Sequence, residues 1–407
     1  MLNQFLRLFI RRGRLTITYA DGSRYSFGEA AADTPDVAVR LTNSSLPLKL
    51  AIWPSFYLGE AYMQGQLAFD QGSLSDFLDL CGHNLELRLQ CRRGIWFRIA
   101  TATLRRLQQH NTAAIARTNA AHHYDLSLEL YRSFLDSDLQ YSCAYFSRPS
   151  LSLEQAQHKK KRHIIAKLLL EPGQRVLDIG CGWGGLAIEI ARTEKVNVLG
   201  VTLSIEQLRI AQQRAAQAGL ADRVSFSLWD YRAVQGQFDR IVSVGMFEHV
   251  GAPQYRTFFE KVHDLMTDQG VAVLHSIGRM HGPELTSAWI RKHIFPGGYI
   301  PALSEVLPQI ERAGLWLTDL EILRLHYAKT LRIWRERFLA HAIQLNSTYD
   351  LHFRRMWEFY LAASEMRFRY AGLMVFQAQL ARKVDTIPPS RNYMFEAETA
   401  GGLIAAG

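Results

Sequence analysis

The stretch Val176-Leu-Asp-Ile-Gly-Cys-Gly-Trp-Gly-Gly185 joins an apolar run to an acid and then to glycines at positions 180, 182, 184 and 185. The run that follows, Leu186-Ala-Ile-Glu-Ile-Ala-Arg192, has helical spacing. Glycine suits such a junction because the backbone must take unusual dihedral angles and let a ligand come within contact distance. The stretch therefore predicts a strand, a ligand-binding turn and the N-terminus of a helix. A turn with only a structural role is the alternative.

Two positions indicate which ligand the turn would hold. Dinucleotide sites share its outline, but they place an acid at the end of the second strand, where it binds the ribose. Here the second strand, residues 196–201, is followed by Thr202, and the acid Asp178 lies inside the turn instead. An acid in that position suits a ligand with a cationic end, such as the amino-acid part of S-adenosylmethionine. The alternative for Asp178 is that it only stabilises the turn.

The sequence around this stretch predicts an α/β fold. Further apolar runs at residues 224–228, 238–244 and 270–275 read as strands, and residues 202–218 lead into a helix that stops at Gly219. Strands that alternate with helical patterns favour a mostly parallel sheet with helices on both faces. Ligands bind at the carboxyl ends of such strands. We therefore expect the site at the ends of these strands.

The 407 residues are enough for two domains. Before residue 115, two alternating runs around Asp21-Gly22 predict a β-hairpin, and residues 56–65 and 73–80 look helical. We expect a small N-terminal α+β domain in residues 1–115, which includes a basic helical connector, and a catalytic domain in residues 116–392. Residues 393–407 read as a frayed tail, and residues 330–384 as a helical pair. Lipid binding and dimerisation are both open as roles of the N-terminal domain.

Composition narrows the class of protein. Hydrophobic residues make up 48% of the chain and charged residues 21%, as in ordinary globular proteins. No apolar run approaches the about 20 residues that span a bilayer, and the N-terminus does not read as a secretory signal. The four cysteines have no metal spacing and do not form a disulfide framework, which favours a reducing cytoplasm and no metal site.

The net charge of +9 is unevenly distributed. Residues 87–119 contain seven arginines and no acid, residues 158–163 read His-Lys-Lys-Lys-Arg-His, and the first residues place Arg7, Arg11, Arg12 and Arg14 beside aromatic and aliphatic side chains. Basic and apolar side chains together are typical of nucleic-acid or anionic membrane surfaces. Because no nucleic-acid motif is present, we expect contact with anionic lipids at a membrane surface. A solvated helix face is the alternative for each cluster.

Six segments carry a specific resemblance. They are Tyr141-Ser-Cys-Ala-Tyr-Phe146, the glycine stretch at 176–185, Thr202-Leu-Ser-Ile-Glu-Gln207, Gly245-Met-Phe-Glu-His-Val-Gly251, His275-Ser-Ile-Gly278 and His326-Tyr-Ala-Lys-Thr-Leu331. With them the chain resembles, over nearly its whole length, the bacterial cyclopropane-fatty-acyl-phospholipid synthases of the class I methyltransferase superfamily. The resemblance implies transfer of a methylene group from S-adenosylmethionine to a cis double bond in a phospholipid acyl chain. It also implies a cytoplasmic enzyme at the inner face of the plasma membrane.

The resemblance also implies which residues form the site. It assigns a bound bicarbonate, which would take the proton at ring closure, to Cys143, Glu248, His275, Ile277 and Tyr327, with Cys143 and Ile277 contributing backbone groups. It assigns S-adenosylmethionine to Tyr141, Ser142, Asp178, Gly180, Gly182, Gly184, Thr202, Leu203, Gln207, Asp230 and Tyr231. The alternatives are that Cys143 is a small buried residue and that His275 is a satisfied core histidine.

The chemistry leaves further alternatives open. The carbocation formed on methyl transfer requires a dry site, which aromatic faces can line. Candidates for that lining, each of which could instead be an ordinary core residue, are Tyr145, Phe146, Phe247 and Tyr299. Covalent catalysis by a C-terminal cysteine is excluded because no cysteine follows Cys181. The other functions left open are a fatty-acyl C-methyltransferase that forms methyl or methylene branches and a membrane-binding module without activity.

Overall fold

The computed structural model describes residues 1–30, 33–89 and 126–403, and the chain divides into two compact units. The first unit comprises Met1–Ala102, Leu285–Pro296 and Ala328–Leu373, and the second comprises Thr103–Glu284, Gly297–Tyr327 and Met374–Gly407. The boundary expected near residue 115, with the basic connector, lies outside the described residues. The first unit differs from the expected N-terminal domain because two later segments of the chain pack with it.

The first unit contains a four-stranded sheet in the order β2-β1-β3-β4. Its strands are β1 (Leu15–Thr18), β2 (Arg24–Phe27), β3 (Val37–Leu41) and β4 (Leu67–Gln71). The predicted hairpin is confirmed: β1 and β2 pair in antiparallel fashion, and Gly22 takes a left-handed φ of 83° in the turn. The helices of this unit are α1 (Leu2–Phe9), α2 (Leu46–Ile52), α3 (Pro54–Met63), α4 (Leu74–Leu89), α12 (Ala288–His293), most of α14 (His326–Ala340) and α15 (Leu351–Tyr370).

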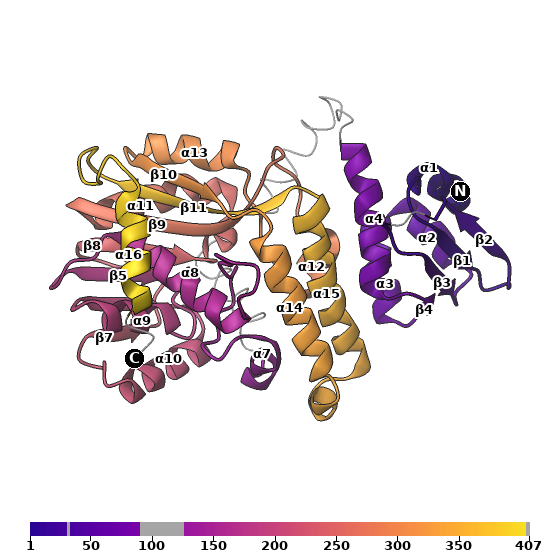
Figure 1. Ribbon diagram of the computed structural model, residues 1–407, viewed down its shortest axis with the longest axis horizontal. Coiled ribbons are helices and arrows are strands. Elements are labelled where there is room, and N and C mark those ends of the chain that lie inside the picture. Colours follow the sequence, from indigo (N-terminus) through magenta and orange to yellow (C-terminus); the bar gives the residue numbers. More distant parts are fainter. Residues whose placement is uncertain (31–32, 90–125, 404–407) are drawn as a thin grey trace. The chain divides into compact units, whose positions relative to one another are not determined.

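The second unit is built on a seven-stranded sheet in the order β10-β11-β9-β8-β5-β6-β7 (Figure 1). The five predicted strands are present as β5 (Arg175–Ile179), β6 (Asn197–Val201), β7 (Val224–Ser227), β8 (Phe238–Val244) and β9 (Met266–Arg279). Each pairs with its neighbour in parallel fashion, as the alternating pattern predicted. Two further strands, β10 (Trp316–Ile322) and β11 (Leu373–Ala381), form an antiparallel pair at one edge.

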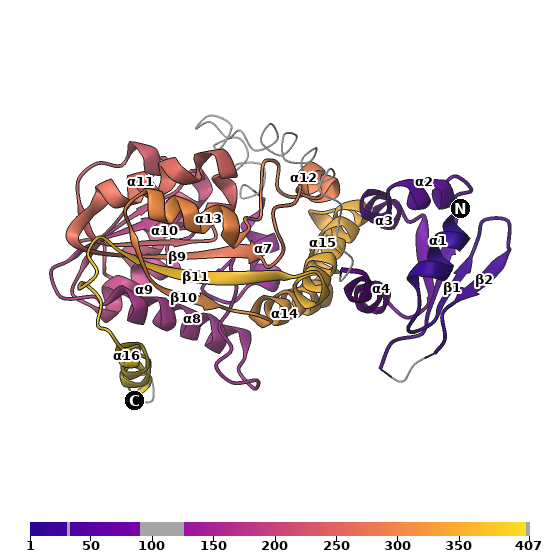
Figure 2. The ribbon, with the colours of Figure 1, turned by 90° about the horizontal axis from the view of Figure 1, so that it is seen from above.

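Helices cover both faces of this sheet. On one face, α8 (Leu153–Leu168), α9 (Gly185–Thr193) and α10 (Ile205–Gln217) pack on side chains such as Val176 and Val242. On the other face, α11 (Tyr255–Leu265) and α13 (Leu303–Arg312) pack on their neighbours Leu177 and Ile241. Figure 2 shows α8 below the sheet and α11 and α13 above it. The short helix α7 (Leu128–Phe134) precedes α8. None of the helices in the described residues is long and apolar enough to cross a bilayer.

The expectation of a helical pair across residues 330–384 is wrong for the last part of this range. Helices α14 and α15 are present, but residues Leu373–Ala381 form β11. All nine residues of this strand are buried. A strand that is covered on both faces has no alternation of polar and apolar residues, so its sequence cannot be distinguished from a buried helix by period alone.

The expectation of a frayed tail is corrected in the same region. Residues Asn392–Leu403 form a helix, α16, and Met394 is buried. The hydroxyl of Tyr393 accepts a hydrogen bond from Gln379 Nε2 at 2.8 Å, and Glu398 pairs with His163 of α8. These contacts hold a segment whose composition alone gave no sign of order.

The basic block at residues 158–163 is only partly exposed, with His158 at the surface and Lys159 and Arg162 half-buried. Lys160, Lys161 and His163 on α8 are buried. Lys161 Nζ pairs with Asp138 Oδ2 at 2.7 Å, and His163 Nε2 lies 2.6 Å from Glu321 Oε2. Acids that are distant in the sequence therefore pair with Lys161 and His163, so these two residues are not free surface charges.

Candidate active site

The glycine turn joins β5 to α9, as its sequence predicted. Gly180, Gly182 and Gly184 all take left-handed φ angles, of 82°, 54° and 80°. A Cβ atom on Gly180 would lie 2.7 Å from Met246 Cβ, and one on Gly184 would lie 2.7 Å from Phe226 Cζ. A Cβ atom on Gly182 would meet no atom within 4 Å. Packing therefore requires glycine at 180 and 184, whereas Gly182 borders open space.

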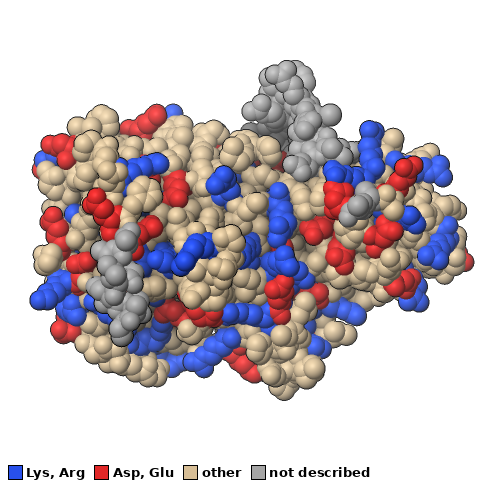
Figure 3. All heavy atoms as spheres, viewed as in Figure 1, with Lys and Arg blue, Asp and Glu red and all other residues tan. Residues whose placement is uncertain are grey.

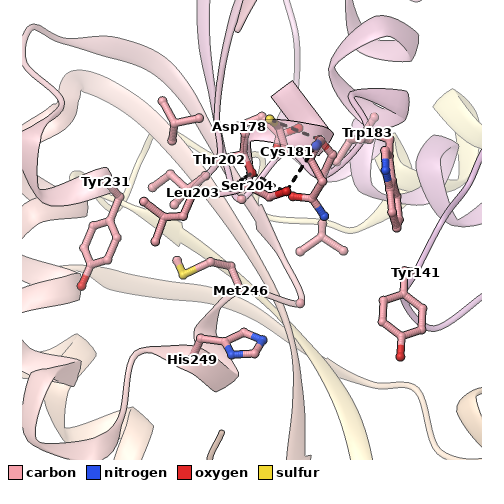
Figure 4. Close-up of a pocket in the computed structure, with 18 of the residues that line it drawn as sticks. Tyr141, Asp178, Cys181, Trp183, Thr202, Leu203, Ser204, Tyr231, Met246 and His249 are labelled. Atoms are coloured by element: carbon pink, nitrogen blue, oxygen red, sulfur yellow. Dashed lines mark hydrogen bonds between the residues drawn. The ribbon is translucent and has the colours of Figure 1, made fainter. Parts of the chain in front are cut away.

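That open space is a pocket at the carboxyl ends of β5, β6 and β8. Every residue that the family resemblance assigned to S-adenosylmethionine lines it except Gly184, namely Tyr141, Ser142, Asp178, Gly180, Gly182, Thr202, Leu203, Gln207, Asp230 and Tyr231. Figure 4 shows Tyr141 and Tyr231 at opposite sides of the pocket, with Asp178 and Thr202 between them. Gly184 is the N-cap of α9 and packs behind the turn.

Several lining residues were not predicted. They include Trp183, Trp229, Arg232, Met246 and His249. Trp183 lies inside the glycine stretch, and Met246 and His249 lie within two residues of Glu248. Their closeness in the sequence to predicted site residues could have indicated that they line the pocket. Burial lowers the pKa of His249 to about 4, which keeps its imidazole neutral.

Asp178 has the environment expected of a residue that binds a cation. Its side chain is buried, and its Oδ2 atom has no hydrogen-bond partner. Burial raises the pKa of Asp178 to about 7, although the charge of Lys160 opposes the shift. An unpartnered buried carboxylate is costly, and a cationic ligand group would relieve that cost. The residues present therefore fit the ammonium end of S-adenosylmethionine.

A buried lysine holds the Tyr141–Ser142 segment at the pocket. Lys160 Nζ donates to Gln140 Oε1 at 2.6 Å and to Ser142 Oγ at 2.8 Å. The side chain of Gln157 adds a hydrogen bond to the carbonyl of Ser142 at 2.9 Å. Burial lowers the pKa of Lys160 to about 8. Lys160 also interacts electrostatically with Asp178, and sequence reasoning missed it because the surrounding basic block read as a surface.

On the side of the pocket opposite Tyr141, the polar residues form hydrogen bonds and an ion pair with one another. Thr202 Oγ1 donates to Gln207 Oε1 at 2.8 Å, and Ser204 caps the helix that carries Gln207. Asp230 forms a bidentate pair with Arg232, at 2.8 Å from Nε and 2.6 Å from a terminal nitrogen. Asp230 thus reaches the pocket as part of an ion pair, whereas sequence reasoning had treated it alone.

Glu248 lies in a 3₁₀ turn (Phe247–His249) directly after β8. Its Oε1 atom accepts the backbone N–H of Ile277 at 2.7 Å, while its buried Oε2 atom has no hydrogen-bond partner. Burial raises the pKa of Glu248 to about 7, and the hydrogen bond from Ile277, with smaller contributions that include Ser276, only partly offsets this effect. The N–H of Ile277 is therefore engaged with Glu248, so Ile277 positions this carboxyl group.

Cys143, His275 and Tyr327 are also buried, and none of the predicted catalytic residues is among the residues that line the pocket. His275 is 2% exposed near the end of β9, and its Nδ1 atom lies 3.1 Å from Gln377 Nε2. Cys143 is fully buried and interacts electrostatically with Lys160, as does His275. Tyr327 is buried beside His326, whose Nδ1 accepts the N–H of Phe146 at 2.9 Å. The fold thus brings the segments that carry Cys143 and Tyr327 together.

Two of the four aromatic candidates for the lining are ordinary core residues. Phe247 is fully buried and stacks on Tyr255, with ring centroids 4.3 Å apart. Tyr299 is 1% exposed, and its hydroxyl donates to Glu305 Oε2 at 2.7 Å. Tyr145 stacks between the rings of His163 and His326. The ordinary core alternative therefore applies to Phe247 and Tyr299.

Similarity to known proteins agrees with this geometry. A family model described as mycolic acid cyclopropane synthetase matches residues 111–378. The chain belongs to this family. A second model, described only as a domain of unknown function, matches residues 1–90.

Individual relatives extend the match. The chain is 38% identical over 358 residues to the cyclopropane-fatty-acyl-phospholipid synthase of Escherichia coli (strain K12), covering 88% of this chain and 90% of the relative. It is 36% identical over 394 residues to tuberculostearic acid methyltransferase UfaA1 of Mycobacterium tuberculosis, covering 94% and 91%. A structure of mycolic acid cyclopropane synthase CmaA1 complexed with SAH and CTAB covers 65% of this chain and 97% of its own, with 34% identity and a TM-score of 0.62.

These similarities confirm the resemblance seen in the sequence, together with the class I methyltransferase fold. The chain is an S-adenosylmethionine-dependent methyltransferase. A membrane-binding module without activity is thereby set aside.

Proposed function

We propose that the chain transfers a methylene group from S-adenosylmethionine to a cis double bond in the acyl chain of a membrane phospholipid and so forms a cyclopropane ring. Its similarity to the Escherichia coli synthase over 88% of the chain supports this substrate class. The observation that carries the proposal is the buried carboxyl group of Glu248, whose Oε2 atom has no partner. Such a group is costly in a core and indicates a polar ligand.

The reaction needs that ligand for its last step. An alkene is a weak nucleophile, so the pocket must hold the sulfonium methyl group against the double bond at contact distance. Methyl transfer leaves a carbocation, and ring closure then requires a base that removes a proton from the new methyl group. A protein carboxylate free to move could instead bond to the cation. Glu248 is fixed by its hydrogen bond to Ile277.

We propose that a bicarbonate ion is this ligand, because the predicted residues offer both hydrogen-bond donors and an acceptor. Glu248 Oε2 can accept its hydroxyl hydrogen, and His275 can donate to its charged oxygens. Cys143 and Tyr327 complete the set that we propose to hold it, and Ile277 enters through its bond to Glu248. Bicarbonate would supply an anionic base of modest strength, held by hydrogen bonds beside the methyl proton.

The function is tested with purified enzyme, S-adenosylmethionine and unsaturated phospholipid vesicles, with lipid mass spectrometry as the readout. We expect the product to gain the mass of one CH₂ group, with fragmentation that locates a ring. Glu248→Gln should lose about 10²- to 10³-fold in turnover, as when one positioned catalytic group is removed, and should keep its affinity for S-adenosylmethionine. Wild-type activity should fall in buffer stripped of carbon dioxide and recover with added bicarbonate. Full activity of enzyme shown to contain no bicarbonate would make a side chain the base, with Glu248 as the first candidate.

A second function is favoured by one relative. The similarity to tuberculostearic acid methyltransferase UfaA1 covers 94% of the chain at 36% identity, close to that of the synthase. Under this alternative the enzyme would form a methyl or methylene branch. A reduced methyl branch would add two hydrogens beyond the CH₂ mass, and a methylene branch would differ from the ring in its fragmentation.

We also propose that the enzyme works on the cytoplasmic surface of the inner membrane through the corner between α2 and α3. Leu48, Ile52 and Trp53 are 55%, 66% and 46% exposed there. Lys49 lies 5.9 Å from the ring centroid of Tyr57, so a cation accompanies the apolar cluster. Pro54 starts α3 and creates the bend. Tryptophan, branched aliphatic side chains and lysine together are typical of segments that enter the interface of an anionic bilayer.

We propose this corner as a lipid contact in addition to the basic cluster at 87–119, and in preference to the other two basic clusters. Within the block at 158–163, Lys160, Lys161 and His163 are buried, and the cluster at 87–119 lies almost wholly outside the described residues. Of the N-terminal arginines, Arg12 and Arg14 pair with Asp33 and Asp36. On the face shown in Figure 3, Lys and Arg side chains are interspersed with Asp and Glu. A local apolar contact with a few cations therefore suits this surface better than a broad electrostatic one.

Vesicle sedimentation tests the corner. Ile52→Glu should weaken binding to anionic vesicles, because it places a charge where an apolar side chain would enter the interface. Ile205→Glu is the matched control, since Ile205 is 67% exposed on α10. Equal loss in both variants, or in neither, would refute the assignment.

A further inference from the structure

A row of buried polar side chains, joined by hydrogen bonds, ends at His275. Gln377 on β11 and Lys167 on α8 are both fully buried. Lys167 Nζ lies 2.9 Å from Gln377 Oε1, and Gln377 Nε2 lies 3.1 Å from His275 Nδ1. Lys167 also donates to Glu321, which in turn lies 2.6 Å from His163 Nε2. Among the described residues, Gln377 is the only side chain in hydrogen-bond contact with His275.

The chemistry of these groups fixes the direction of every hydrogen bond. A lysine ammonium has only donors, so it requires the carbonyl oxygen of Gln377 on its side. The amide NH₂ of Gln377 must then face His275, and because this group only donates, Nδ1 must accept. A neutral imidazole that accepts at Nδ1 carries its proton on Nε2. The opposite orientation of the amide would set its NH₂ group against the lysine ammonium.

The charges around the row keep these states in place. Burial raises the pKa of Glu321, but hydrogen bonds from His163 and Lys167 and their charges outweigh it and lower the pKa to about 2. Glu321 therefore stays ionised and holds the ammonium of Lys167. Burial lowers the pKa of His275 well below its usual value, and the charges of Lys160 and Lys167 lower it further. A second proton on the ring is thereby disfavoured.

We propose that Gln377 and Lys167 are positioning residues that hold His275 as the neutral tautomer with its proton on Nε2. His275 then offers the site a hydrogen-bond donor and no basic nitrogen. It can bind an anion, but it cannot take the methyl proton at ring closure. This inference rests on the proposed function for its catalytic meaning, whereas the state of the ring is a property of the ligand-free protein.

The ring is tested by nitrogen-15 NMR of histidine-labelled enzyme, in which the two ring nitrogens report the tautomer directly. His275→Asn assigns the resonances. We expect protonation at Nε2 in the wild type. In Gln377→Glu, a carboxylate oxygen faces Nδ1 where an NH₂ group was, so the proton should move to Nδ1. Turnover should then fall about 10²- to 10³-fold, the range for loss of one positioned donor, with unchanged affinity for S-adenosylmethionine.

The same strand offers a matched control. Gln379 is also fully buried, and its Nε2 donates to the carbonyl of Lys167 at 2.6 Å and to Tyr393 without contacting His275. Gln379→Glu places the same charge in the same interior. It should leave the tautomer of His275 unchanged and should alter turnover by no more than a few-fold. If Gln377→Glu does not fold, Gln377→Met removes both hydrogen-bonding groups at similar volume and should give a mixture of tautomers.

The outcomes separate this proposal from the function on which it rests. A wild-type ring protonated on Nδ1 would overturn it, as would a Gln377→Glu enzyme that keeps the wild-type tautomer and turnover. The NMR measurement needs neither substrate nor bicarbonate. An Nε2-protonated ring in an enzyme that needs no bicarbonate would therefore support the inference while refuting the proposed base.

Discussion

Replacing Gly182 by alanine isolates the part of the glycine turn that faces the ligand. The added Cβ would meet no protein atom within 4 Å, so the folded protein has room for it. The left-handed φ of 54° still imposes a backbone cost of about 1–2 kcal/mol on any residue with a side chain. Gly219, at the end of α10, has the same properties: a φ of 68° and no atom within 4 Å of an added Cβ. It does not line the pocket.

The two variants should therefore lose the same free energy of unfolding, about 1–2 kcal/mol, but differ in ligand binding. In Gly182→Ala the methyl group occupies space where S-adenosylmethionine approaches the backbone. Overfilling a close-packed contact costs about 1–3 kcal/mol. At about 1.4 kcal/mol for each tenfold change in affinity, this corresponds to a roughly 5- to 150-fold weaker Kd. Gly219→Ala should bind with the wild-type Kd.

Isothermal titration calorimetry measures the affinities, and urea unfolding measures the stabilities. The reasoning fails if Gly182→Ala binds S-adenosylmethionine like the wild type, because the ligand would then not lie against this turn. Equal weakening by Gly219→Ala would also contradict it, since backbone strain alone would then explain the loss.

Three further predictions concern the same pocket and the glycine turn beside it. The pKa of Asp178 is raised to about 7 in the ligand-free protein, so the affinity for S-adenosylmethionine should increase as the pH rises through 7. Calorimetry in two buffers should detect the proton released on binding, and an Asp178→Asn enzyme with the same pH profile would contradict this prediction. The carboxyl group of Asp178 binds its proton more tightly in the folded than in the unfolded protein. The free energy of unfolding of the ligand-free protein should therefore fall as the pH rises from 3.8, the usual pKa of aspartate, towards 7; urea unfolding with Asp178→Asn as reference can check this. Gly184→Ala should destabilise the protein by more than Gly182→Ala, because its Cβ would lie 2.7 Å from Phe226; equal stability of the two variants would show that the packing there relaxes freely.

Local sequence determined the central half of the fold and the cofactor pocket. Each of the five parallel strands is a short apolar run that ends in a polar residue or a glycine, and parallel strands bring those ends to one edge. The glycine stretch specified its own turn because left-handed φ angles favour glycine. This is why residues as far apart as Asp178, Thr202 and Asp230 were placed in one pocket without a structure. The catalytic set came from the resemblance, because no spacing relates Cys143 to Tyr327, and so did the cofactor contacts of Tyr141 and Ser142.

The features that depend on burial were decided only by the tertiary structure. Strand β11 is covered on both faces and has no period, so its role as a neighbour of β9 was not visible. Lys160 and Lys161 read as surface charge, yet an amide and an acid from another segment bind them and make them buried structural groups. The state of His275 depends in the same way on Gln377, 102 residues later in the chain. Charge is a property of a residue, but its solvation and its partners are set by the packed fold, and these determine what the charge can do.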